Sequence, residues 1–375
     1  MQRGDDTVPK DATLVYVGTY TGAKSRGIYL FRLQPEPDAV SQNVTLAPLG
    51  LAAASSNPSF LELDATRRLL FAVNEDDRFE GNASGAVSAF AIDRSTGTLT
   101  RINQRPSMGT SPCHLVLDRT RRHLLVANYG SGSVAVLPVA ADGRLGAASQ
   151  VVQHTGHSVN PERQQGPHAH CVTIDRANRF VFVCDLGLDQ VLVYRFDAQR
   201  GTLTPHDAPF AALKPGAGPR HMVFGPDGRF AYVINELNCT VTAFTRDTSS
   251  GALSEMQTVS TLPAGDAMQR GYSTAEIALS PSGAFLYGSN RGHNSITVFA
   301  VDKASGRLTY VANTPTGGKT PRGFGIEPGG GYLLAGNQDS DVVVVFRIDR
   351  ATGKLTATGA TVAVGKPVDV KFVRP

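Results

Sequence analysis

Residues 218–237, GPRHMVFGPDGRFAYVINEL, contain the clearest copy of the pattern from which the fold of this chain can be predicted. Its centre reads as a β-hairpin, because apolar residues alternate on both sides of a Pro-Asp-Gly turn. Its ends carry Arg220 and His221 on one side and Glu236 on the other. A hairpin brings its open ends together, so two basic groups and a carboxylate are predicted to meet there.

The same pattern recurs along the whole chain. The other copies are NPSFLELDATRRLLFAVNE (57–75), SPCHLVLDRTRRHLLVANY (111–129), PHAHCVTIDRANRFVFVCD (167–185), STAEIALSPSGAFLYGSNR (273–291) and TPRGFGIEPGGGYLLAGNQ (320–338). Each is followed by a third apolar run such as SITVFAVD (295–302) and by a turn such as KASGRLT (303–309), which leads into a fourth run. Positions equivalent to the first proline fall at 58, 112, 167, 219, 274, 321 and 367, so the repeats are 46 to 55 residues apart. Four short strands at this period are typical of β-propeller blades.

The seventh unit is divided between the two ends of the chain. KPVDVKFV (366–373) reads as a first strand with nothing after it, whereas TLVYVGTY (13–20) and GIYLFRL (27–33) read as second and third strands. Joining them closes a ring and removes exposed sheet edges. The sequence therefore predicts an all-β protein, with one seven-bladed β-propeller over residues 13–375 and an N-terminal extension over residues 1–12.

In such a blade the first strand is innermost and the second runs back beside it. The start of the first strand and the end of the second then meet at one mouth of the central channel. The side chains predicted at this mouth include Glu75, His114, Tyr129, His168, His170, Arg220, His221, Asn235, Glu236, Glu276, Asn290, Arg291, Arg322, Gln338 and Asp369. The asparagine that recurs after the second strands is interpreted first as structural, because its amide can satisfy loop backbone groups. Substrate binding by Asn235 and Asn290 is the alternative.

Two inserts are expected to overhang the same mouth. HTGHSVNPERQQG (154–166) and PAGDAMQRGYS (263–273) each precede a first strand. We interpret them as walls or a lid over a pocket, with flexible surface loops as the alternative.

A ring of buried charges is costly unless the charges are paired, so its composition calls for an explanation. One explanation is structural: mutual salt bridges around a water-filled channel. The other is a pocket for a small anion, in which arginines bind carboxylate or phosphate and Glu236 or a histidine acts as general base. Oxygen ligands at Glu75, Asn128, Asp185 and Asn235 leave a hard metal open, but the neighbouring arginines argue against it, so no metal and no cofactor is predicted.

Other function classes lack their signatures. The sequence contains no GxSxG and no phosphate-binding glycine loop. The 36 basic and 32 acidic residues give a net charge of +4 without basic clusters, and no apolar run is long enough for a bilayer, so neither nucleic acid nor a membrane is an expected partner. The N-terminus has no apolar leader, which predicts a cytoplasmic protein or a periplasmic one whose leader was removed. We expect a monomer or weak homodimer.

The four cysteines lack zinc-site spacing. If Asp175 and Phe180 close their hairpin, Cys171 and Cys184 lie directly opposite each other. Two small buried side chains are favoured over a disulfide, because neighbouring strands rarely suit disulfide geometry.

Several motifs together resemble the seven-bladed propeller lactonase family, which includes propeller-type 6-phosphogluconolactonases and carboxymuconate lactonising enzymes. They are YVGTYTGAKSRGIYLFRL (16–33), GPHAH (166–170), the 218–237 hairpin, SNRGHNSITVF (289–299) and FRIDRATGKL (346–355). The similarity runs from about residue 13 to the C-terminus. It departs from the family pattern at Cys171, where serine is expected, and in the loop 263–273.

The resemblance implies metal-independent chemistry on a lactone ring at the central mouth. It carries the family's histidine to His168 or His170, its two arginines to Arg220 and Arg291, and its acid to Glu236. The implied reaction is hydrolysis of 6-phospho-D-glucono-1,5-lactone in the pentose phosphate pathway. A lactonising or cycloisomerase activity on a carboxylated muconate and a noncatalytic binding scaffold are the alternatives.

Overall fold

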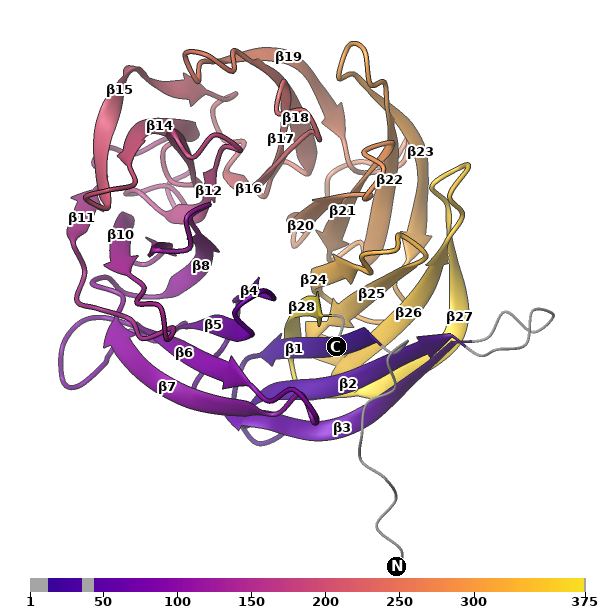
Figure 1. Cartoon of the computed structure of the whole chain (residues 1–375). Helices are drawn as coiled ribbons and strands as arrows, with labels where there is room; N and C mark the ends of the chain where they lie inside the picture. The colour runs from indigo at the N-terminus through magenta and orange to yellow at the C-terminus, as the bar shows by residue number, and fades with distance from the viewer. Residues whose placement is uncertain (1–12, 36–43, 374–375) are drawn as a thin grey trace, which may run out of the picture.

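The computed structural model describes residues 13–35 and 44–373 and shows seven four-stranded antiparallel sheets arranged as blades in a ring (Figure 1). The predicted seven-bladed propeller is confirmed. The predicted N-terminal extension, residues 1–12, lies outside the described residues.

The strands of each blade follow one another from the channel outward. The closing blade has β28 (Pro367–Val373), β1 (Thr13–Thr19), β2 (Gly27–Pro35) and β3 (Val44–Ala54). The next has β4 (Leu61–Asp64), β5 (Leu69–Asn74), β6 (Ala86–Ile92) and β7 (Leu99–Pro106). The third has β8 (Pro112–Leu117), β9 (His123–Asn128), β10 (Ser133–Pro138) and β11 (Gln150–Gln153). The fourth has β12 (Ala169–Ile174), β13 (Phe180–Asp185), β14 (Gln190–Asp197) and β15 (Thr202–Ala212).

The remaining three blades follow the same order. They are β16 (Pro219–Phe224), β17 (Phe230–Asn235), β18 (Thr240–Arg246) and β19 (Leu253–Ser260); β20 (Ser273–Leu279), β21 (Phe285–Arg291), β22 (Ser295–Val301) and β23 (Leu308–Pro315); and β24 (Pro321–Ile326), β25 (Tyr332–Asn337), β26 (Val342–Ile348) and β27 (Leu355–Ala363). A 3-10 turn, η1 (Gln338–Ser340), follows β25. In the described residues no helix has the length and apolar character needed to cross a lipid bilayer.

The ring closes through the two ends of the chain, as the split seventh repeat predicts. β28 pairs with β1 from Leu14 opposite Val373 to Thr19 opposite Pro367. The first and last described strands therefore lie in one blade (Figure 1). This pairing places Asp369, whose carboxylate accepts a bond from the Leu61 amide 2.8 Å away in the next blade, on the channel wall.

The hydrophobic core lies between blades. One cluster joins Phe182 and Val191 of the fourth blade to Met222 and Phe244 of the fifth. Because each blade packs against a neighbour on either side, both faces of its inner strands are buried. Hydrogen bonds at the turns before the fourth strands add to the contacts between neighbouring blades.

A repeated tyrosine connects neighbouring blades. The Tyr287 hydroxyl on β21 donates to the Gly353 carbonyl of the next blade at 2.9 Å, and Tyr232 does the same to Gly306 at 3.0 Å. Gly306 has a φ of 71°, and a Cβ there would stand 2.3 Å from the Phe230 ring. The glycine of this turn is therefore required both for its conformation and for the close approach of the blades.

The register of the fourth blade places Cys171 opposite Cys184, as predicted. Both are buried free thiols. They act as small side chains in the core between the fourth and fifth blades.

Candidate active site

A cavity of about 240 Å³ lies at the mouth where the inner strands begin and the second strands end. It is lined by Glu75, Cys113, Tyr129, Arg163, His170, Glu236, Ser273, Arg291 and Arg322. Three arginines against two glutamates give the lining an excess of positive charge, and Arg220 stands directly behind Glu236. The cavity is therefore suited to a small anion.

A repeated β-bulge aims the inner-strand side chains at this cavity. The pairing of first and second strands skips one residue between Pro112 and His114, and equivalent skips occur in the fourth, fifth and seventh blades. The residues left out of the register are Cys113, His170, Arg220 and Arg322. A bulged residue is unpaired and can be turned away from the strand alternation. In each of these blades the bulge therefore brings one side chain to the mouth.

Glu236 is the centre of an ion-pair cluster. Its carboxylate lies 2.7 Å from Arg163 Nη2, 2.9 Å from Arg291 Nη2 and 3.1 Å from Arg220 Nε. Burial by itself would raise the pKa of Glu236, but the charges of these arginines outweigh burial and hold the pKa well below its usual range. A carboxylate so strongly stabilised in its ionised form is a poor proton acceptor.

Arg220 is fully engaged by its neighbours. Its Nη1 donates to the Ala275 carbonyl at 2.6 Å and lies 3.2 Å from His221 Nε2, while its Nε faces Glu236. Only 3% of the side chain is exposed. Arg220 therefore fixes the position of Glu236 from behind and offers little to a ligand.

Arg322 is placed very differently. Its nearest ionic partner, Glu75, is 3.9 Å away, and its guanidinium lies over the Tyr20 ring at 5.3 Å. The single Tyr20 hydroxyl proton is shared between the two Glu75 oxygens, 2.8 and 2.9 Å away, so Tyr20 and not Arg322 is the nearest donor to this carboxylate. Across the described ranges no hydrogen-bond acceptor is found for Arg322, whose side chain is 18% exposed. Its donors are available to a ligand in the cavity.

Of the two histidines in GPHAH, His170 reaches the cavity. Its Nδ1 lies 3.6 Å from Cys113 Sγ, and its ring packs edge-on against Tyr129. Burial and then the charge of Arg220 hold the pKa of His170 well below its ordinary value. His170 is therefore neutral at pH 7, so a ring nitrogen can accept a proton, but the low pKa makes it a weak base in the unliganded protein.

His168 stands behind Tyr129 instead of lining the cavity. The two rings stack with centroids 4.5 Å apart, and His168 Nδ1 lies 3.0 Å from the Tyr129 carbonyl oxygen. His168 thus supports the wall on which Tyr129 stands.

His221 and Glu276 belong to a second cavity, of about 370 Å³, which also contacts Phe324 and Lys371. His221 Nδ1 lies 3.1 Å from Glu276 Oε1. His221 does lie beside Arg220, with their nitrogens 3.2 Å apart, but together with Glu276 and His114 it lines this second cavity and not the mouth cavity. Successive residues of an extended strand point in different directions, so the bulged Arg220 turns to the mouth and His221 to the second cavity.

Asn235 and Asn290 are buried inside their blades. Asn235 Nδ2 donates to the Thr240 and Thr242 hydroxyls at 2.9 Å, and Asn290 Nδ2 donates to the Thr261 carbonyl at 3.0 Å. These contacts are those expected of a structural asparagine. Gln338 begins η1, where its amide donates to Asp339, and it is not part of the cavity lining.

The residues considered above as possible metal ligands each form hydrogen bonds with different protein groups. Asp185 Oδ2 lies 2.6 Å from His154 Nδ1, its Oδ1 accepts the His168 amide, and Asn128 donates to the Ser107 carbonyl. Within the described part of the chain, no group of three or more His, Cys, Asp or Glu side chains is arranged to hold a metal ion.

Arg163, Cys113 and Ser273 line the cavity but were not singled out by the sequence. Arg163 and Ser273 come from the two inserts that were expected to overhang the mouth, so the inserts were a usable signal although the individual residues were not. Cys113 occupies the bulge position of the third blade, which is visible only once the strand register is known.

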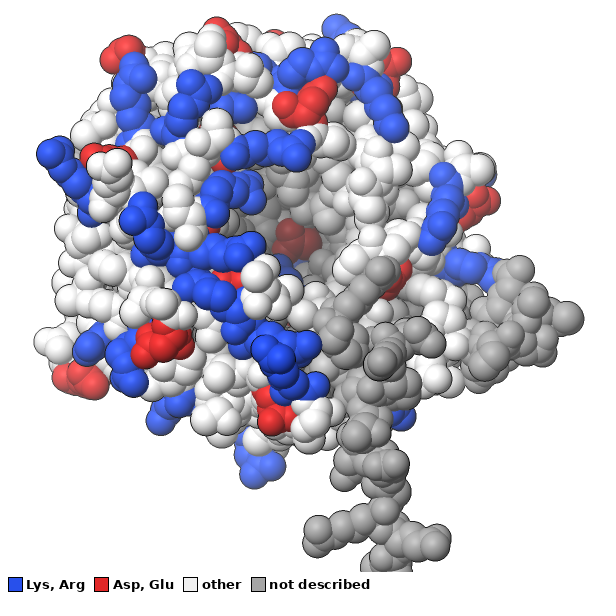
Figure 2. Space-filling view, in the orientation of Figure 1, with Lys and Arg blue, Asp and Glu red and all other residues white. Residues whose placement is uncertain are grey.

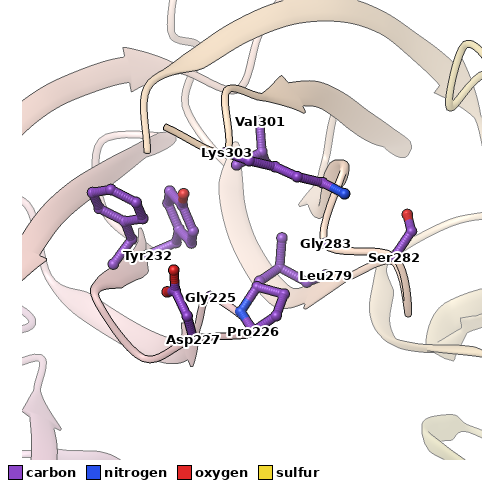
Figure 3. Close-up of a pocket in the computed structure, with 10 residues that line it drawn as sticks. Gly225, Pro226, Asp227, Tyr232, Leu279, Ser282, Gly283, Val301 and Lys303 are labelled. Carbon is purple, nitrogen blue, oxygen red and sulfur yellow. The ribbon is translucent and has the colours of Figure 1, made fainter. Parts of the chain in front are cut away.

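A further cleft, of about 140 Å³, lies between the fifth and sixth blades (Figure 3). Pro226, Leu279 and Val301 give it mainly apolar walls, and the Tyr232 hydroxyl beside it already donates to Gly306. Its charged lining residues are Asp227 and Lys303, whereas five charged side chains line the mouth cavity. Figure 2 shows that the surface is also hollowed at the centre of the ring.

Comparison with known proteins identifies relatives over nearly the whole chain. The sequence profile described as "Lactonase, 7-bladed beta-propeller" matches residues 14–372. A 6-phosphogluconolactonase of Bacillus subtilis is 37% identical over 309 residues, covering 82% of this chain and 83% of the relative. A 6-phosphogluconolactonase of Formosa agariphila is 32% identical over 318 residues, covering 83% and 86%.

Solved structures agree with the sequence comparison. The periplasmic gluconolactonase of Pseudomonas aeruginosa superposes with a TM-score of 0.89 at 38% identity, over 97% of this chain and 100% of that one. The ring of blades, the charged mouth cavity and these relatives lead to one assignment: the chain belongs to the seven-bladed β-propeller lactonase family, whose members hydrolyse lactones.

Proposed function

We propose that this lactonase hydrolyses 6-phospho-D-glucono-1,5-lactone to 6-phosphogluconate, the lactone-opening step of the pentose phosphate pathway. The names of the Bacillus and Formosa relatives support this substrate. The observation that carries the proposal is Arg322, a cavity arginine whose hydrogen-bond donors are not used by the described residues. A guanidinium with free donors is suited to bidentate binding of phosphate or of a developing oxyanion.

His170 is the proposed general base. It is neutral, lines the cavity and lies among arginines, whereas Glu236 is held ionised by three of them. His170 would take a proton from water as the oxygen of that water attacks the lactone carbonyl carbon. The carbonyl electrons move to oxygen, and an arginine stabilises this oxyanion. When the carbonyl re-forms, the bond to the ring oxygen breaks and His170 returns the proton to that oxygen.

An anionic substrate would improve this base. The Arg220 and Arg322 charges help to keep the pKa of His170 low. A phosphate bound to the arginines offsets part of their positive charge and therefore raises the pKa of His170 towards neutrality, where a general base is most effective. Glu236 serves to orient the arginines.

A direct assay of the purified protein tests the proposal. The rate of acid release from 6-phospho-D-glucono-1,5-lactone is compared with that from glucono-1,5-lactone and from carboxymuconolactone, each corrected for spontaneous hydrolysis and repeated in EDTA. We expect the phosphorylated lactone to have the highest kcat/KM and EDTA to change nothing. A preference for either other lactone would overturn the proposed substrate, and a loss of activity in EDTA that calcium restores would overturn metal-independence.

The assembly state and the compartment follow from the same proposal. We propose a monomer or weak homodimer, which light scattering after size-exclusion chromatography checks. A phosphorylated sugar lactone carries a charge that retains it inside the cell, so we propose a cytoplasmic enzyme. Neither nucleic acid nor a membrane is a proposed partner.

A further inference from the structure

Arg163 differs from every other residue that lines the mouth cavity. The others lie on a blade strand or directly after one, whereas Arg163 belongs to the connection between β11 and β12. It reaches the cavity from the insert 154–166 and so is not part of the repeated blade pattern. A residue added from outside the repeat is a candidate for setting what this particular chain binds.

The insert holds Arg163 in a defined position. Asn160 Oδ1 accepts hydrogen bonds from the Glu162 and Arg163 amides at 3.0 and 3.1 Å. The buried Gln164 side chain donates to the Leu186 carbonyl at 2.8 Å and accepts from the Asn160 amide at 3.0 Å. The segment is thus a built turn that is anchored to the fourth blade.

The guanidinium of Arg163 is only partly used. Its Nη2 donates to Glu236 Oε1 at 2.7 Å and to the Tyr129 hydroxyl at 3.1 Å. In the described portion of the chain nothing else accepts from it, and 40% of the side chain is exposed. The Nε and Nη1 groups are therefore available to a ligand.

If the Arg163 guanidinium turned from Glu236 to a ligand, Glu236 would still have two arginine partners. Glu236 keeps Arg291 at 2.9 Å and Arg220 at 3.1 Å, so its charge stays compensated. Arg220 could not be moved in the same way, because it also holds the Ala275 carbonyl and is buried. Among the three partners of Glu236, Arg163 is the most exposed, at 40% of its side chain against 15% for Arg291 and 3% for Arg220, so a substrate anion reaches it most readily.

We propose that Arg163 is a specificity-determining residue that binds the anionic group of the substrate and so discriminates phosphorylated from unphosphorylated lactones. This inference rests on the proposed function for the identity of the anion. In this proposal the insert 154–166 selects the charge of the substrate, and residues on the blades carry out the hydrolysis.

The test compares Arg163→Gln and Arg163→Lys with wild type and with a matched control, Arg270→Gln. Arg270 is an exposed arginine in the other insert at the same mouth and is not part of the cavity lining. For Arg163→Gln we expect KM for the phosphorylated lactone to rise roughly tenfold to hundredfold, the loss typical of one charged hydrogen bond. We expect kcat/KM for glucono-1,5-lactone to change less than about threefold. Arg163→Lys should recover part of the loss, and Arg270→Gln should match wild type.

Calorimetric titration with inorganic phosphate gives a readout independent of turnover. Phosphate should bind wild type and Arg270→Gln but bind Arg163→Gln at least about tenfold more weakly. Equal losses on both lactones, or unchanged phosphate affinity, would overturn the role of Arg163, because it would then act only by neutralising Glu236. In a third outcome, the wild type does not hydrolyse the phosphorylated lactone, but Arg163→Gln binds phosphate more weakly than the wild type. That result would overturn the proposed substrate and support the anion site.

Discussion

The two ends of the propeller channel use arginine in opposite ways. At the mouth, Arg163, Arg220 and Arg291 converge on the single carboxylate of Glu236. At the other end, the hairpins between first and second strands carry a second set, whose guanidinium groups bond to backbone carbonyls of neighbouring blades. Figure 2 shows basic side chains gathered on one side of the central hollow, near β5 and β8.

The hairpin arginines behave as ties between blades. Arg67 Nη2 donates to the Arg121 carbonyl at 2.6 Å, Arg122 Nη2 to the Ala198 carbonyl at 3.0 Å, and Arg179 Nη2 to the Thr248 carbonyl at 2.5 Å. Each bond crosses from one blade to the next. A carbonyl is a neutral acceptor, and the exposed side chains of Arg122 and Arg179 reach solvent, so their positive charge is hydrated and does not create a ligand site. Arg67 is also paired with the Asp64 carboxylate 2.5 Å away, which neutralises its charge.

The role of each arginine therefore depends on which acceptor it contacts and on how deeply that acceptor is buried. A buried carboxylate such as Glu236 concentrates several guanidinium groups where water is scarce, and an anion can compete for them. A surface carbonyl holds one guanidinium for structure alone. The mouth arginines should therefore affect activity, and the hairpin arginines only stability.

The largest expected effect is on turnover. His170→Gln keeps a polar side chain but removes the proposed base, so kcat should fall by about 10²–10⁴. The melting temperature should change little, because no charge is removed from the cluster. Steady-state rates and thermal melting on one preparation provide the check. Turnover within about twofold of wild type would exclude His170 as the base.

The second effect separates a positioning carboxylate from a catalytic one. Glu236→Gln leaves three arginines without their shared partner, and breaking a buried ion pair costs about 3–5 kcal/mol. We therefore expect lower stability in urea unfolding, together with a higher KM because the arginines are no longer oriented.

The matched control lies at the other end of the channel. Asp175 pairs with the buried Arg246 at 2.7 Å. Asp175→Asn should lower stability similarly while kcat/KM per folded molecule stays unchanged. A stable Glu236→Gln protein whose kcat alone is reduced roughly a thousandfold would contradict the positioning role and make Glu236 the base.

The third effect compares single arginines from the two sets. Arg291→Ala should raise KM for the anionic lactone roughly tenfold to hundredfold, since a charged hydrogen bond contributes about 1.5–3 kcal/mol. Arg122→Ala should lower stability by about 1 kcal/mol and leave both kinetic constants unchanged. Kinetics and unfolding curves for both variants decide the matter. If Arg122→Ala altered KM, the division between the two ends would fail.

The smallest effect is on pH dependence. Burial and neighbouring cations lower the pKa of His170 and of His221, so both stay neutral in the folded protein just below about pH 6.5, where an ordinary histidine gains a proton. The acid limb of kcat/KM should therefore lie below about pH 6.5. The unfolded chain binds those protons first, so the free energy of unfolding should decrease as pH falls through this range.

Profiles of kcat/KM and of urea unfolding between about pH 4 and 8 test both statements. A kinetic limb above about pH 6.5 would show that His170 is not the group that must be neutral.

Much of the fold and part of the site could be predicted from the sequence, because they depend on periodic local patterns. The repeat, the split seventh blade and the meeting of Arg220 with Glu236 all follow from strand alternation and hairpin turns. The roles of particular side chains were harder to predict. His168 and His170 are equivalent in the sequence, and only the bulge at His170 turns that ring into the cavity.

The number of blades, the closure of the ring and the class of side chain at its mouth can be read from the chain alone, because hydrophobic periodicity and turn residues act over a few neighbouring positions. Only the tertiary structure decided which arginines share Glu236, that Arg163 joins them from an insert, and that His221 serves another cavity. Those outcomes depend on strand register, bulges and contacts between residues far apart in the chain. No local pattern encodes such distances.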